Sequence, residues 1–108
     1  MVTLGLIEKI NIGGKEFLAK IDTGADSSCI DLKSASRLNL GPIIGFRRIK
    51  SAHGKSIRPT VKALIRLKGR AIRAELSVVS RSKLKYKVLL GKRTLKKLGF
   101  LIDPRKWN

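Results

Sequence analysis

The sequence predicts an all-β fold, a small and mostly antiparallel barrel with one short helix near its C-terminal end. Apolar and polar residues alternate in several runs of strand length, and turns that contain glycine separate these runs. Apolar residues recur at convincing helical spacing at one place, Leu95 and Leu98. A chain of 108 residues, 43% of them hydrophobic, can build one core. We therefore expect a single domain over residues 1–108.

The expected elements follow one another through short turns. Gly13 and Gly14 suit a tight hairpin turn between the first two strands. Residues 51–56 form the tip of a later hairpin, the chain turns again at Gly69, and Gly99 suits the C-terminal cap of the helix. We expect strands over residues 4–10, 15–21, 28–31, 43–50, 57–67, 72–78 and 100–103, one helical turn over 33–38, and the helix that ends at Gly99.

Charge is the unusual feature of the composition. The chain has 25 Lys and Arg against 7 Asp and Glu, a formal net charge of +18. The basic residues are scattered along the predicted strands, so they indicate solvated faces of an ordered sheet rather than a disordered basic tail. A field of this size favours an anionic partner, such as RNA, the ribosome or an acidic peptide. A basic protein without such a partner is the alternative.

Several function classes are excluded by what the sequence lacks. No apolar run approaches the length of a membrane span. The N-terminal residues indicate a strand rather than a signal peptide. The single Cys29 cannot form an internal disulfide, so we expect a cytoplasmic protein. One His and one Cys cannot hold a zinc ion, and there is no phosphate-binding glycine loop. We expect neither a metal nor a cofactor.

The stretch Asp22-Thr23-Gly24 places a potential catalytic acid on a turn between two predicted strands. Alternation in the preceding strand ends at Asp22, and Gly24 permits a sharp turn and close approaches of the backbone. A carboxylate in this position is fixed by backbone on both sides. The alternative interpretation is an ordinary Asx-turn between two strands, because Asp and Gly are common turn residues.

A second stretch resolves this choice. Asp22-Thr23-Gly24-Ala25 resembles the active-site loop of the retropepsins, and Val88-Leu89-Leu90-Gly91 followed by a short helix resembles their later Leu-Leu-Gly element. The resemblance extends over nearly the whole chain in order. It is strongest to the RimB-like branch, formerly labelled "ATP-dependent zinc proteases". The resemblance implies a retropepsin-like acid-protease barrel.

The resemblance also implies a homodimer. Aspartic proteases need two carboxylates that share one proton, and this chain has one such loop, so each subunit would supply its Asp22 across a twofold axis. Thr23 would exchange hydrogen bonds with its counterpart across that axis. Gly24 would let the backbone meet a bound peptide, and Ala25 would lie beneath it.

Further roles follow from the same resemblance. Asp26 would pair with the basic residue after Gly91, which is Lys92 here where Arg is usual, and Arg93 is the substitute. Leu89 and Leu90 would pack beneath the loop, and Gly91 would support it. The hairpin over residues 50–58 would be the flap that closes over substrate. The residues expected to contact substrate are Ala25, Asp26, His53, Gly54, Lys55 and Leu90.

The predicted function is therefore that of a homodimeric aspartic endopeptidase acting on peptides, with glutamate-rich tails of a ribosomal protein as candidate substrates. The alternative is a basic RNA- or ribosome-binding module on a retropepsin fold with little or no proteolysis. His53 as a catalytic base and Cys29 as a nucleophile are weaker interpretations. The histidine has no identifiable partner, and the cysteine lies in an apolar strand.

Overall fold

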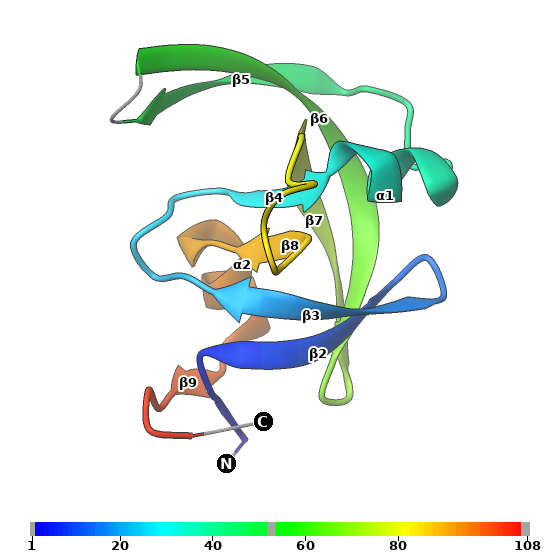
Figure 1. Ribbon diagram of the computed structural model, residues 1–108. Coiled ribbons are helices and arrows are strands. Elements are labelled where there is room, and N and C mark those ends of the chain that lie inside the picture. The colour runs from blue at the N-terminus through cyan, green and yellow to red at the C-terminus, as the bar shows by residue number, and fades with distance from the viewer. Residues whose placement is uncertain (1, 52–53, 107–108) are drawn as a thin grey trace.

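Six strands close a barrel, and a seventh strand extends it into a hairpin (Figure 1). The structure, a computed structural model, describes residues 2–51 and 54–106. The barrel order is β2-β3-β8-β4-β7-β6, and β6 pairs back with β2, while β5 pairs with β6 alone. The predicted all-β barrel is confirmed. The elements are β1 Thr3–Leu4, β2 Ile7–Ile12, β3 Lys15–Ile21, β4 Ser28–Asp31, α1 Leu32–Arg37, β5 Gly45–Ser51, β6 Gly54–Leu67, β7 Arg70–Val79, β8 Val88–Leu90, α2 Lys92–Leu98 and β9 Leu101–Ile102.

Alternation along the strands builds the core. Along β2, β3, residues 61–67 of β6 and residues 74–78 of β7, every second residue is buried, while the residues between them are mostly exposed or half-buried. Helix α2 packs against β7 and β4 through Leu95 and Leu98. The helix ends at Gly99, which has a left-handed conformation with φ of 72° as expected for a C-terminal cap.

The N-terminal strand differs from its prediction. The expected strand over 4–10 is divided, because the chain bends at Gly5 and Leu6 between β1 and β2. The buried carboxylate of Glu8 accepts a hydrogen bond of 2.6 Å from the Gly5 N–H and lies 3.5 Å from the Lys68 ammonium. This side chain stabilises the bend. β1 then pairs in parallel with β9, so the two ends of the chain lie together (Figure 1).

Strand β8 brings two distant parts of the sequence together. It pairs in parallel with β3 and antiparallel with β4, and therefore separates these two strands. The loop over residues 22–27, which connects β3 to β4, consequently spans the end of β8. No helix in the described part of the chain is long and apolar enough to cross a membrane.

Candidate active site

The loop over residues 22–27 is fixed at its start by backbone hydrogen bonds. The Asp22 N–H donates to the Leu90 carbonyl at 2.9 Å, and the Ala25 N–H donates to the Asp22 carbonyl at 3.2 Å. The Gly24 N–H donates to Asp22 Oδ1 at 2.9 Å. The loop is thus an Asx-turn in its geometry. Asp22 is half-buried, and Thr23 and Gly24 are exposed, so the carboxylate lies where a second protein chain can reach it.

Gly91 lies directly beneath the loop. A Cβ atom built on Gly91 would lie 2.5 Å from the Ser27 carbonyl oxygen and 2.8 Å from that of Ala25. Its φ of −95° is open to any residue. Glycine is therefore required here by the close approach of the two backbones rather than by a special backbone angle. The next N–H, from Lys92, donates to the Ala25 carbonyl at 2.7 Å. The two backbones are therefore joined at contact distance.

Two buried hydroxyl groups complete this support. Ser28 Oγ accepts a hydrogen bond from the Gly91 N–H at 2.9 Å and lies 2.6 Å from Thr94 Oγ1. Both side chains are almost fully buried. Sequence reasoning missed this pair, because 66 positions separate the residues and nothing in the sequence distinguishes them from surface hydroxyls.

The structure contains the ion pair expected between Asp26 and Lys92. Lys92 Nζ lies 3.0 Å from Asp26 Oδ1. The hydrogen bond and charge of Lys92 hold the pKa of Asp26 below its ordinary value. The Arg93 N–H donates to the Asp26 carbonyl at 3.1 Å. Because the Asp26 side chain is 79% exposed, water and salt screen this pair strongly.

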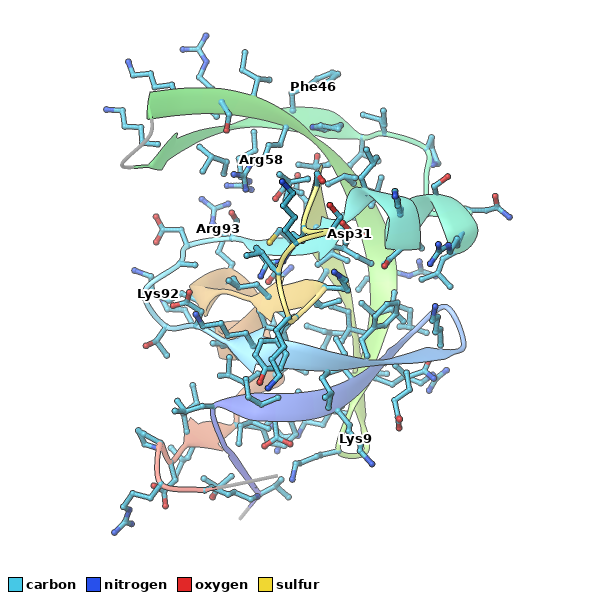
Figure 2. All side chains as sticks on the ribbon, in the orientation of Figure 1. Lys9, Asp31, Phe46, Arg58, Lys92 and Arg93 are labelled. Atoms are coloured by element: carbon cyan, nitrogen blue, oxygen red, sulfur yellow. The ribbon has the colours of Figure 1, made fainter. Side chains whose placement is uncertain are left out.

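A basic cleft lies between the loop and the β5–β6 hairpin. Its volume is about 610 Å³, and loop residues 24–27 form one wall. Figure 2 shows Arg58 on the side of the hairpin that faces the body, with Arg93 across from it. Asp26 is the single acidic residue among its described lining residues. The basic residues that line the cleft are Arg47, Arg48, Lys50, Arg58, Arg81 and Arg93.

The arginines of the cleft differ in how they are bound. Arg47 Nη2 lies 3.3 Å from Glu75 Oε2. Arg81 donates from Nε to the Tyr86 carbonyl at 2.9 Å and from Nη1 to the sulfur of Cys29 at 3.5 Å. Arg58 Nε is buried and has no hydrogen-bond partner within the described chain. A buried unsatisfied donor is costly, and the same side chain also lines the cleft.

A family model described as "RimB-like: Retropepsin-like aspartic endopeptidase RimB" matches residues 32–107. The chain belongs to this RimB-like family. The matched range begins after the Asp22 loop, so the assignment of that loop rests on its own residues and geometry. No curated protein matches the chain by sequence.

Solved structures share the fold. The chain resembles Lpg0085, a protein of unknown function from Legionella pneumophila, with a TM-score of 0.71, 18% identity and coverage of 97% of this chain and 95% of that one. It also resembles the EIAV protease in complex with the inhibitor HBY-793, with a TM-score of 0.74, 24% identity and coverage of 87% and 88%. It also resembles the simian foamy virus (mac) protease, with a TM-score of 0.65, 22% identity and coverage of 85% of this chain and 93% of that one. At these identities the likeness establishes the fold alone.

In the RimB-like chain, some of the residues predicted to contact substrate lie in the cleft and others do not. Leu90 is fully buried in the core, so its side chain packs beneath the loop and does not reach a bound substrate. Leu89 is half-buried and lines the cleft. Gly54 and Lys55 begin β6 and are not among the residues that line the cleft. His53 lies outside the described residues.

Cys29 is a poor nucleophile in this environment. Its side chain is buried, and burial raises the pKa of the thiol against the opposing charge of Arg81. A thiol with a raised pKa has little of the reactive thiolate at neutral pH. Among the described residues, no group of three or more His, Cys, Asp or Glu could hold a metal ion.

Proposed function

We propose that this RimB-like chain is a homodimeric aspartic endopeptidase, with Asp22 of each subunit in the catalytic pair. The observation that carries the proposal is the position of Asp22, which is held by backbone on both sides at an accessible surface beside a cleft. The family and the fold support the reaction class. One chain supplies one such carboxylate, so a second copy completes the site.

The chemistry follows from two carboxylates at close distance. Like charges a few ångströms apart cannot both ionise at low cost, so the pair holds one shared proton. The ionised carboxylate accepts a proton from water, and the protonated one donates to the peptide carbonyl oxygen. Thr23, exposed at the turn, would bond to its counterpart, and Gly24 and Ala25 line the cleft where a peptide would lie.

The cleft favours an acidic peptide. Six basic residues surround it and one acidic residue, Asp26, is already paired with Lys92. Arg58, which lines the cleft, would donate from its guanidinium group to a substrate carboxylate. A glutamate-rich tail of a ribosomal protein has the matching charge, and the cytoplasm is the matching compartment. The β5–β6 hairpin, with Gly54 and Lys55 at its end, would close over the bound chain.

Replacement of the candidate catalytic carboxylate tests this function. We expect Asp22→Asn to lower cleavage of a glutamate-rich peptide by roughly 100-fold or more, because an amide cannot take part in proton transfer. Binding of the peptide should persist, since the cleft arginines are unchanged. Asp26→Asn is the matched control in the same loop and should retain most of the cleavage. Cleavage by Asp22→Asn at the wild-type rate would exclude the aspartic mechanism.

The proposed dimer should respond to salt. Two chains together carry twice +18, and like charges within a Debye length of about 10 Å at 0.1 M salt repel one another. We expect sedimentation to show tighter association at moderate salt than at low salt. An association constant that does not vary across this range would contradict the expectation, and a monomer at every concentration would contradict the dimer itself.

The alternative function, RNA or ribosome binding, has one observation in its favour. Between Asp31 and Glu75 the chain has no acidic residue and twelve basic ones. A segment of this charge attracts phosphate chains. It is compatible with proteolysis, because a nucleic acid could occupy a different surface from the cleft.

A further inference from the structure

The β5–β6 hairpin has one face whose apolar residues do not line the cleft of the candidate active site. In an antiparallel pair, residues directly opposite each other project to the same side. The register places Arg48 opposite Ile57 and Lys50 opposite Lys55, with Phe46 two residues before Arg48. These five residues, Phe46, Arg48, Lys50, Lys55 and Ile57, are called the outer hairpin face below.

The opposite face of the hairpin is turned toward the body. Arg47 reaches Glu75 on β7, and the Nε atom of Arg58 is buried. Figure 2 shows Phe46 on the side of the hairpin away from the body and Arg58 on the side toward it. Arg48 and Lys50 also reach the rim of the cleft, whereas Phe46 and Ile57 do not line it.

Two large apolar side chains on the outer hairpin face are open to solvent. Phe46 is 71% exposed and Ile57 is 66% exposed, the two highest values among the large hydrophobic residues of the described chain. Cations at alternate strand positions adjoin them. An exposed aromatic ring beside Arg and Lys on an extended sheet combines a surface for base stacking with counter-charges for phosphates.

We propose that the outer hairpin face binds single-stranded RNA, with Phe46 stacking on a base and Arg48, Lys50 and Lys55 contacting phosphates. Charge complementarity selects this occupant, because the whole hairpin lies in the segment without acidic residues. A second copy of the chain would place like charges against one another. The cations separate the apolar side chains, which does not suit insertion into lipid. The inference does not depend on the protease assignment.

The experiment measures binding of the full chain to a fluorescein-labelled 12-nucleotide oligouridine across a range of salt concentrations. We expect Phe46→Ala to weaken binding roughly 5- to 150-fold, the usual loss for one stacked base, with no change in salt slope. Leu101→Ala removes an apolar side chain that is 57% exposed on β9 and should leave the affinity unchanged. Arg48→Gln should reduce the slope of log K against log salt by about 0.7.

Two further probes separate stacking from charge alone. Inorganic polyphosphate has the charge of a nucleic acid and no bases, so Phe46→Ala should bind it as the wild type does. Vesicles that contain phosphatidylglycerol test a membrane surface. Oligouridine affinity unchanged in Phe46→Ala, an equal loss for polyphosphate, or a loss of vesicle binding alone would each overturn the proposal. The melting temperature of Phe46→Ala should match that of the wild type, since the ring is exposed.

Discussion

The loop over residues 22–27 and the β5–β6 hairpin form opposite sides of one cleft, yet they are held in very different ways. Three backbone hydrogen bonds join the loop to β8 and α2, and Gly91 lies against its underside. From Thr60 onward β6 belongs to the barrel and pairs with β7, but the projecting part of the hairpin, residues 45–51 and 54–59, has one described ion pair to the body, from Arg47 to Glu75. The side that bears Asp22 is fixed, and the side that covers it has few anchors.

This difference matches two separate requirements of the proposed catalysis. A pair of carboxylates must keep its geometry within a fraction of an ångström, whereas a long peptide must enter and leave. The fixed side contains buried hydroxyls and a glycine without room for a methyl group. The hairpin instead has exposed cations and apolar side chains. Substitutions should therefore have much larger effects on the loop side than on the hairpin side.

The largest effect is expected at the glycine beneath the loop. In Gly91→Ala the new Cβ would meet two backbone carbonyls, so the loop must move, at a cost of about 3 kcal/mol in stability and with loss of cleavage. Gly45→Ala in β5 is the matched control, because its Cβ would lie 3.5 Å from Thr60 Oγ1 at ordinary contact distance. Urea unfolding of both variants makes the comparison. Equal destabilisation would mean that the two sides are not held differently.

A smaller contrast is expected between two buried hydroxyls. Ser28→Ala leaves the Gly91 N–H without its acceptor, so we expect a loss of about 2 kcal/mol. Thr60 Oγ1 on the hairpin strand is buried with no hydrogen-bond partner among the described residues. Thr60→Val should therefore be neutral or stabilising. Thermal unfolding measures both, and a larger loss for Thr60→Val would reverse the comparison.

The smallest effect is expected at the one exposed contact of the fixed side. Asp26 is paired in water, whereas the buried Asp31 accepts hydrogen bonds from the Arg81 N–H at 2.7 Å and the Ser34 N–H at 3.3 Å. Asp31→Ala removes a helix cap and should cost about 1–2 kcal/mol. Asp26→Ala should change the melting temperature little, and less at high salt. A greater loss for Asp26→Ala would contradict the burial argument.

Asp31→Ala also tests how the stability of the protein responds to acid. Burial raises the pKa of Asp31, but the hydrogen bonds from Arg81 and Ser34 outweigh it, so the pKa lies below the ordinary 3.8. The stabilisation is then fully present above that value and is lost as the pH falls through the lowered pKa. Stability of Asp31→Ala should fall less than that of the wild type in this range. Chemical unfolding at pH 5 and pH 3 provides the measurement.

Most of the fold could be predicted from the sequence, because alternation and glycine turns are local signals. The bend at Gly5 was missed, since it depends on a carboxylate that becomes buried only in the folded chain. In the site, the Asp22 turn and the contact between Asp26 and Lys92 were expected. The hydroxyl pair of Ser28 and Thr94 was not, because a contact across 66 positions has no local pattern.

Two further features could not be read from the chain. With 25 basic residues spread along the sequence, composition cannot tell which of them face the cleft, and the unpartnered nitrogen of Arg58 depends on tertiary burial. Which of Leu89 and Leu90 points inward could not be predicted, because a run of apolar residues does not reveal it. Strand pairing decides this, since β8 alternates buried Val88, half-buried Leu89 and buried Leu90.

The position of β8 in the sheet has a consequence for timing during synthesis. This strand comes late in the chain, yet it occupies the space between β3 and β4. A nascent chain that has grown to residue 80 contains Asp22 but lacks the Leu90 carbonyl and the Gly91 backbone that hold its loop. At roughly 5–20 residues per second, several seconds separate the two segments on the ribosome. The loop that bears Asp22 therefore cannot take its folded form until the chain has been made past residue 92.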